Sequence, residues 1–435
     1  MTKNLLMRSV RFRSVACASL LALAACNSSS AGSTSGAGGT GTGSGGAASG
    51  GAGPGNGGAP GSGGTPGGGG TTGSGGATGG GGTTGGHGGS TVIDAAADGP
   101  VTALNPVATH GQLKVVGTQL QDQSGKPVQL KGVSSQWLNL ESKTFPESKP
   151  AIQYARDHWK LSVIRAAMGV DTSGGYLGTG TGANANQAGM LSKVNTIVQN
   201  AIDLGIYVIV DWHTSDAVTA KGTTTQAMQA SAFFTQIAAQ YGTSPNVIYE
   251  PFNEPTTATW AQIKPYHEAV VAAIRAVDSD NLIVLGTPTW SQDVDLAAAD
   301  PLTGTNLLYT LHFYACTHGQ ALIDKANTAL SLGLPLFVTE FGATPADGGV
   351  TKSGDNDVCE PETNVWFAWM AQNNISGAAW KLDQCTDSSC ILTADAPVDG
   401  PWTDNYLTSD SGGTPIDGGE KGGGHGQFVV NWIRE

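Results

Sequence analysis

Eight short runs of β-branched and apolar residues alternate with helix-compatible stretches, and this alternation limits the possible folds more than any other feature. The runs are residues 127–133, 161–167, 206–212, 246–252, 281–287, 307–313, 336–342 and 375–381. Each is almost continuously apolar, as parallel strands buried on both faces should be. Helical stripes occupy 190–205, 227–242 and 259–277, and Gly205 and Gly242 stand where C-capping glycines belong.

Eight strands alternating with helices over residues 101–435 predict a (β/α)8 TIM barrel. A doubly wound open sheet is the alternative. The segment 111–126 predicts a small β-hairpin that closes the barrel floor. The helices after the first and fifth strands are expected to be short or irregular.

The segment before the barrel has a different composition. Residues 27–93 contain no Asp, Glu, Lys or Arg and consist mostly of Gly, Ser, Thr and Ala. Such a segment has too few side chains to bury to offset its conformational entropy. We therefore predict that residues 26–100 form a disordered tether ahead of the folded domain.

The N-terminus predicts export. A positive segment with Lys3, Arg8, Arg11 and Arg13 precedes the short apolar run "SLLALAAC". This pattern is typical of a signal peptide, here residues 1–25, and is too short for a membrane-spanning helix. "LAAC" resembles the bacterial lipoprotein box, which implies lipid attachment at Cys26, and Asn27 resembles outer-membrane sorting. Cleavage after Ala25 to give a freely secreted protein is the alternative.

The net charge limits the classes of binding partner, and the cysteine content indicates disulfides. A net charge of −13 argues against nucleic acid and against binding an anionic membrane except through the lipid anchor. A neutral polymer is a better fit as the binding partner. We expect a monomer without a cofactor. No metal site is expected, because paired His-x-His and CxxC spacings are absent. Four cysteines follow the tether and are expected in disulfides. Because Cys385 and Cys390 are close in sequence, the predicted pairs are Cys385–Cys390 and Cys316–Cys359.

Polar residues stand at the carboxyl ends of most of the predicted strands, where barrel enzymes carry their chemistry. They are Arg165, Asp211, Trp212, His213, Asn253, Glu254, His312, Tyr314, Glu340 and Trp380. Glu254 and Glu340 follow the fourth and seventh strands, which face each other across a barrel mouth. Glycoside cleavage requires two such carboxyl groups, one to protonate the leaving oxygen and one to attack. Glu250, inside the fourth strand, is expected to be a buried partner of a neighbouring donor.

Several motifs then resemble family 5 of the glycoside hydrolases, in its bacterial endoglucanase branch. They are "VIYEPFNEP", "LFVTEFG", "IRAAM", "IDLGIYVIVDWH", "IRAVDSDNLIVLGTPTWSQDVD" and "LHFYACTHGQ". The resemblance covers nearly all of residues 110–435. It implies a retaining endo-β-1,4-glucanase acting on cellulose or a related β-glucan. A β-mannanase or xyloglucanase of the same family, or an inactive glycan-binding surface lipoprotein, are the alternatives.

By position, the resemblance makes Glu254 the acid/base and Glu340 the nucleophile. Arg165 and Tyr314 would stand beside Glu340 and favour its charge, and that charge would raise the pKa of Glu254. The remaining implied contacts are Asn253 to the sugar 2-hydroxyl, His213 and His312 to hydroxyls or the carboxylates, and Trp380 stacked on a sugar face.

The chain departs from the family pattern at three places. "SSQWLNL", residues 134–140, replaces Ser-His-Gly-Leu-Gln-Trp, so a sugar platform there is lost or rebuilt. Phe341 stands where Trp is common. "WKLDQC" replaces the usual sequence after the eighth strand, which leaves open whether Lys381 takes the place of the family's sugar-binding lysine.

Overall fold

The computed structural model describes residues 103–180, 182–215, 224–346, 358–384, 387–409 and 424–435. The predicted signal peptide, Cys26 and the predicted tether lie outside these residues, so the predicted domain limits stay predictions.

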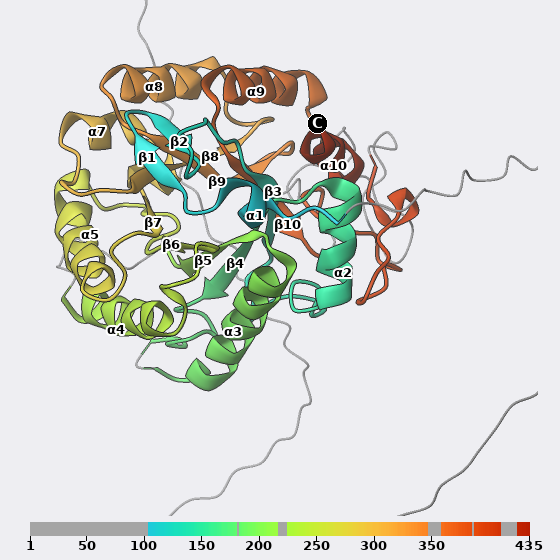
Figure 1. Cartoon of the computed structure of the whole chain (residues 1–435), viewed down its shortest axis with the longest axis horizontal. Helices are drawn as coiled ribbons and strands as arrows, with labels where there is room; N and C mark the ends of the chain where they lie inside the picture. Colours follow the sequence, from blue (N-terminus) through green and yellow to red (C-terminus); the bar gives the residue numbers. More distant parts are fainter. Residues whose placement is uncertain (1–102, 181, 216–223, 347–357, 385–386, 410–423) are drawn as a thin grey trace, which may run out of the picture. The chain divides into compact units, whose positions relative to one another are not determined.

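Eight parallel strands form a closed barrel, in which each strand pairs with its neighbour in sequence and the last pairs with the first (Figure 1). The strands are β3 (Lys131–Ser135), β4 (Val163–Gly169), β5 (Tyr207–His213), β6 (Val247–Glu250), β7 (Leu282–Leu285), β8 (Leu307–Tyr314), β9 (Leu336–Gly342) and β10 (Gly377–Leu382). Every predicted strand is present within a few residues of its expected place. The (β/α)8 prediction is confirmed, and the open sheet is wrong.

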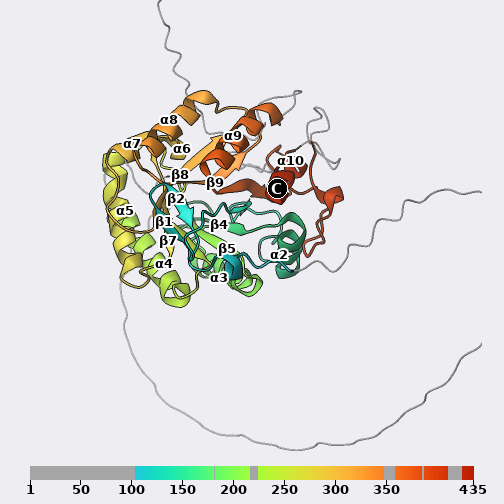
Figure 2. The ribbon, with the colours of Figure 1, turned by 45° about the horizontal axis from the view of Figure 1, so that its top comes forward.

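Helices cover the outside of the barrel (Figures 1 and 2). They are α1 (Pro106–His110), α2 (Lys149–Tyr154), η1 (Ala155–Trp159), α3 (Gln187–Leu204), α4 (Thr224–Tyr241), α5 (Trp260–Arg275), α6 (Pro288–Ser291), α7 (Val294–Ala299), α8 (Gln320–Ser331), α9 (Glu360–Asn373), η2 (Asp404–Tyr406) and α10 (Gly426–Arg434). As predicted, the helices after the first and fifth strands are short, and Gly205 ends α3 in the left-handed conformation. Within the described residues, no helix has the length and hydropathy needed to cross a bilayer.

The predicted hairpin is also present and closes the barrel floor. Strands β1 (Lys114–Val116) and β2 (Gln119–Gln121) pair in antiparallel fashion. Leu113 and Leu120 from this hairpin pack in one apolar cluster with inward residues of the barrel strands, including Ile209 and Leu282. The floor is therefore sealed with apolar side chains, and the polar residues are left at the opposite end.

Strand alternation decides which side chains enter the barrel. In β5, Val208 packs outward among the helices, whereas Ile209 belongs to the inner cluster. Successive side chains of a strand point to opposite faces, so Asp211 and His213 also face inward. Being further along the strand, they lie at the mouth.

Strand β9 departs from this alternation by one residue. Its pairing with β8 advances from Phe337 to Glu340 while β8 advances only from Thr310 to His312, and its pairing with β10 shows the same extra residue. Such a β-bulge re-aims side chains locally. As a result, the adjacent Thr339 and Glu340 both contact groups inside the barrel.

A disulfide joins Cys316, just after β8, to Cys359, just before α9. This pairing matches the one predicted from the sequence. It connects two loops of the mouth, because Cys316 follows Tyr314 by two residues. Cys385 lies outside the described residues, so the Cys385–Cys390 pairing stays a prediction.

A carboxyl pair fastens the loop after β3 to helix α3. Glu141 and Glu147 both accept hydrogen bonds from the ammonium group of Lys193, the second at 2.7 Å. The Glu141 side chain is only 6% exposed. Burial, followed by the charge of Glu147, raises the pKa of Glu141 to about 8. Glu141 is therefore protonated at neutral pH.

We predict that this pair makes the fold sensitive to alkali. The pKa of Glu141 is higher in the folded than in the unfolded chain, so its contribution is complete below about pH 4.3 and is lost as pH rises through about 8. In urea unfolding at pH 5 and pH 9, Glu141→Gln should reduce the difference between the two free energies of unfolding by roughly 2–4 kcal/mol. Glu268→Gln, on the exposed face of α5, is the control and should leave the difference unchanged. An equal alkaline loss in wild type and Glu141→Gln would contradict this prediction.

Candidate active site

Arg165 is the centre of the polar cluster at the barrel mouth. It is fully buried on β4 and lies within ion-pair distance of three carboxylates: Asp211 Oδ2 at 2.9 Å, Glu250 Oε2 at 2.7 Å and Glu340 Oε2 at 3.0 Å. A buried cation holds buried anions in place when each is also hydrogen-bonded. Glu250 is buried and paired, as predicted, but its donor Arg165 lies on β4, which does not neighbour β6, so the expected neighbouring-strand donor is wrong.

Both oxygens of Glu340 accept hydrogen bonds. Arg165 Nη1 donates to Oε2, and the Tyr314 hydroxyl donates to Oε1 at 2.6 Å. The predicted positions of Arg165 and Tyr314 beside Glu340 are therefore confirmed. Burial, followed by the charge of Glu340, holds the pKa of Tyr314 well above its usual range, so this hydroxyl remains a donor. Two such donors stabilise a negative charge on Glu340.

Glu254 follows β6 and faces His312. One ring nitrogen, His312 Nδ1, lies 2.9 Å from Glu254 Oε1. Burial raises the pKa of Glu254 to about 7, opposed by Arg165 and increased by Glu250. The expected cause, the charge of Glu340, is therefore wrong. The depth of the site has the largest effect, and the carboxylate that adds to it is Glu250.

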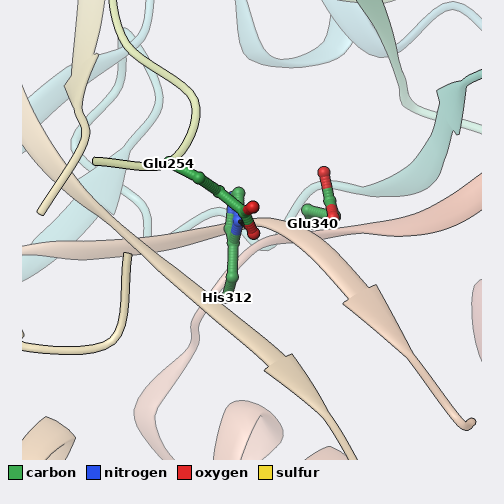
Figure 3. A group of neighbouring side chains, drawn as sticks. All are labelled: Glu254, His312 and Glu340. Atoms are coloured by element: carbon green, nitrogen blue, oxygen red, sulfur yellow. Dashed lines mark hydrogen bonds and ion pairs between the residues drawn. The ribbon is translucent and has the colours of Figure 1, made fainter. Parts of the chain in front are cut away.

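The two candidate catalytic carboxyl groups are close together. One oxygen of Glu254, one oxygen of Glu340 and a ring nitrogen of His312 lie within 4.8 Å of one another (Figure 3). Carboxyl groups about 5–5.5 Å apart suit direct attack on a sugar, whereas about 6.5–9.5 Å leaves room for a water. The spacing suits direct attack.

These three residues are also the one group in the described part of the chain with the ligand types and spacing for a metal ion. Arg165 and Tyr314 donate to the two oxygens of Glu340, and His312 Nδ1 lies beside Glu254, so all three residues already take part in hydrogen bonds. The arrangement is better suited to proton transfer and nucleophilic attack.

His213 lies at the mouth, and its expected contact with substrate hydroxyls stays a prediction. Its Nδ1 lies 2.6 Å from Asp211 Oδ2, and its Nε2 lies 3.4 Å from Asn253 Nδ2. Burial, followed by the charge of Arg165, lowers the pKa of His213 to about 3, so the ring is neutral. Within the described residues it hydrogen-bonds neither Glu254 nor Glu340. It orients Asn253, whose Oδ1 accepts from Arg165 at 2.6 Å.

Aromatic rings line one side of the mouth. Trp380 stacks on His213 with ring centroids 5.4 Å apart, and Trp137 meets the same ring edge-on at 4.5 Å. Trp380 and Trp137 also pack beside Tyr314. Trp137 was not among the predicted site residues, although it lies in the segment 134–140 that departs from the family pattern.

The comparisons with known proteins agree with this geometry. Residues 121–386 match the family described as "Cellulase (glycosyl hydrolase family 5)". The chain belongs to glycosyl hydrolase family 5. The match covers more than half of the chain, and it includes Glu254 and Glu340.

Individual family 5 relatives are bacterial. An endoglucanase of Clostridium saccharobutylicum is 44% identical over 308 residues, covering 69% of this chain and 63% of that protein. Endoglucanase Z of Dickeya dadantii is 45% identical over 239 residues, covering 55% and 52%. This chain therefore spans about half to two thirds of the length of these two relatives. The solved catalytic domain of a Thermobifida fusca endoglucanase superposes with a TM-score of 0.63 at 29% identity, covering 76% of this chain and all of that one.

The departures from the family 5 pattern have structural consequences. Leu140, at the place of the usual Trp, is 54% exposed. Phe341 is buried in the core against Phe313 and Trp432. Lys381 is buried and donates to Asp387 Oδ2 at 2.8 Å, with its ammonium 5.8 Å from the Trp380 ring centroid. The lysine is thus held at the mouth beside the aromatic wall.

Proposed function

We propose that the protein is a retaining endo-β-1,4-glucanase that hydrolyses internal bonds of cellulose or a related β-glucan. The observation that carries the proposal is the pair Glu254 and Glu340, with carboxyl oxygens within 4.8 Å. The environments of the two groups differ in the direction that their roles require. Glu254 has a pKa of about 7, and Glu340 is held by a cation and a hydroxyl. The names of the relatives and the solved complex of the Thermobifida fusca enzyme with cellotetraose support the substrate class.

In the first step, Glu340 attacks the anomeric carbon while Glu254 gives its proton to the departing glycosidic oxygen. The products are a glycosyl ester on Glu340 and a new chain end. Arg165 and Tyr314 hold the two oxygens of Glu340 in place before attack. Asn253 has one N–H left after its contact with His213, and we assign it to the sugar 2-hydroxyl.

In the second step, the ionised Glu254 takes a proton from water, and the resulting oxygen attacks the glycosyl ester. This returns Glu340 as a carboxylate and Glu254 as an acid. Two inversions give net retention of the β-configuration. Trp380 supplies a flat apolar surface beside the reacting sugar, as tryptophan does in many sugar sites.

Polymer hydrolysis followed by viscosity and reducing ends tests the proposal. An endo-acting enzyme should lower the viscosity of carboxymethylcellulose before many reducing ends form. A panel of β-1,4-glucan, mixed-linkage glucan, xyloglucan, xylan and mannan then ranks the substrates. NMR of the fresh product should show the β-anomer first. An initial α-anomer would overturn the retaining mechanism, faster mannan or xyloglucan cleavage would overturn the specificity, and glucan binding without turnover would identify a binding protein.

Trp290 is presented next to Glu254 by an unusual turn. Thr289, Trp290 and Ser291 have positive φ angles of 56–57°, a conformation that costs about 1–2 kcal/mol per non-glycine residue. Trp290 N–H donates to the carbonyl of Pro255 at 2.9 Å, and the Ser291 hydroxyl donates to that of Asn253 at 2.7 Å. The Trp290 side chain nevertheless remains 44% exposed. We assign it to a sugar platform on the leaving-group side.

We predict that Trp290→Ala raises KM for cellulose oligomers by about tenfold, because one aromatic contact is removed. The kcat for oligomers that occupy only the opposite side of the cleavage point should change little. Leu296→Ala on α7, which removes an apolar side chain of similar exposure, is the control and should leave KM unchanged. An unchanged KM in Trp290→Ala would assign the side chain to packing.

We further propose that the enzyme is lipid-anchored at the cell envelope through Cys26 and reaches its polymer on the tether of residues 26–100. The support is the charged segment, the apolar run and "LAAC" in the sequence. Mass spectrometry of the mature N-terminal peptide tests this. A diacylglyceryl group on Cys26 is expected, and it should be lost, with release into the medium, in Cys26→Ala. An unmodified N-terminus at Cys26 would indicate free secretion.

A further inference from the structure

The candidate acid and nucleophile are joined through the protein interior by a continuous chain of hydrogen bonds. From Glu254 it passes through His312, Thr339, Glu250 and Arg165 to Glu340. We propose that Glu250, acting through the Thr339 hydroxyl, fixes the tautomer of His312 and so holds Glu254 in its protonated form. This inference rests on the proposed role of Glu254 as the acid. It makes Thr339 and Glu250 positioning residues.

The chain starts from a fixed acceptor, Glu250. Arg165 donates to both of its oxygens, from Nε to Oε2 at 2.7 Å and from Nη2 to Oε1 at 3.3 Å. Burial raises the pKa of Glu250, and the charge of Arg165 opposes this shift. With both oxygens held by the guanidinium, Glu250 acts as an acceptor of hydrogen bonds. Its Oε1 also accepts from the Thr339 hydroxyl at 2.6 Å and from the Thr310 hydroxyl at 3.3 Å.

Thr339 transmits this constraint because a hydroxyl has one hydrogen. That hydrogen is engaged by Glu250 or by the adjacent hydroxyl of Thr310. The Thr339 oxygen is then an acceptor for His312 Nε2, which lies 2.9 Å away. Burial lowers the pKa of His312 to about 4, so above that pH the ring has a single N–H. The geometry places this hydrogen on Nε2.

The tautomer of His312 in turn acts on the carboxyl group of Glu254. With Nε2 protonated, His312 Nδ1 presents a lone pair to Glu254 Oε1 at 2.9 Å. Only a protonated carboxyl group can donate to that lone pair, whereas an ionised one is repelled by it. The arrangement favours the acid before the first step. The same arrangement makes the ionised Glu254 a stronger base in the second step.

Other charged and titratable groups also surround Glu254 and His312 and influence their pKa values. They are Arg165 from β4, Asp211 and His213 from β5, Glu250 from β6, Tyr314 from β8, His318 from the loop after β8 and Glu340 from β9. None of them hydrogen-bonds either nitrogen of His312 within the described residues. Substitution at Thr339 therefore alters the tautomer without removing a charge.

Nitrogen NMR of the histidine-labelled full chain tests the tautomer directly. At about pH 5.5, between the pKa of His312 at about 4 and that of Glu254 at about 7, His312 should be in the Nε2–H form. The His312 signals are assigned by their loss in the variant His312→Asn. An Nδ1–H form in the wild type would overturn the proposal. This measurement does not depend on activity, so it is independent of any failure of the proposed glucanase function.

The pH dependence of kcat/KM tests the effect on Glu254. Thr339→Val should free His312 to become the Nδ1–H form and move the alkaline limb to lower pH by about one unit. Thr339→Ser should restore both properties. Thr363→Val on α9 removes an equally buried hydroxyl that donates to the Cys359 carbonyl, and it should change neither. An unmoved alkaline limb in Thr339→Val, with or without a loss of rate, would overturn the proposal.

Discussion

Glu340→Ala is expected to lower kcat on β-glucan at least about a thousandfold, because removing the nucleophile leaves only binding and acid catalysis. The side chain lies at the end of the buried polar cluster, with both oxygens held by Arg165 and Tyr314. No other carboxylate in the described residues has that combination of donors and access to the mouth. KM should change much less than kcat.

Azide distinguishes loss of a nucleophile from loss of structure. A small anion fits the space left in Glu340→Ala and should restore turnover by direct attack. Because only one inversion then occurs, the product is the α-glycosyl azide. The exposed Glu268→Ala on α5 controls for charge removal and should keep wild-type rates. Near-wild-type activity of Glu340→Ala without azide, or a β-azide product, would contradict the assignment.

Glu254→Gln is expected to have the second largest effect, about a hundred- to ten-thousandfold on natural glucan, because the leaving sugar oxygen requires a proton. The same variant should form the glycosyl ester nearly normally from an aryl cellobioside with a strongly acidic phenol, which departs without protonation. The ester should then accumulate, since no base activates water. A burst of released phenol followed by slow turnover is the expected trace.

The pH profile gives a second measure of Glu254. Activity of the wild type should fall as pH rises through about 7, because the acid must be protonated and its pKa is about 7. In Glu254→Gln this limb should vanish from the burst phase, whereas Glu268→Gln should retain it. An equal rate loss for natural and activated substrates would mean that Glu254 has a role other than proton donation.

Sequence periodicity was sufficient to predict the barrel. Eight apolar runs at regular spacing indicate strands, and Gly205 at the end of a helical stripe gives the end of α3. Residues at strand ends follow from the same pattern, so Arg165 and Glu340 could be placed in one mouth from sequence alone. Their contact requires more than strand order, because β4 and β9 do not pair and Glu340 is turned inward by the bulge in β9.

Properties that depend on the burial of a side chain or on irregular backbone geometry could not be predicted from sequence periodicity. Thr339 reads as an ordinary strand residue and keeps the alternation of Phe337, whereas the inward position of Glu340 follows from the bulge in β9. The raised pKa of Glu254 comes first from burial, which no local pattern reports. The 2.6 Å contact between His213 and Asp211 was not predicted. Each of these depends on how several strands pack.

The extra residue in β9 also limits how such a site can change during evolution. Thr339 and Glu340 face inward together only because β9 is one residue longer than its neighbours at that point. A single deletion there would restore strict alternation and turn one of the two outward. The surrounding loops can gain or lose residues without this penalty. The extra residue at this position of β9 is therefore required together with the glutamate pair. Its presence or absence offers a criterion for separating barrels that have a working pair from barrels that retain only the fold.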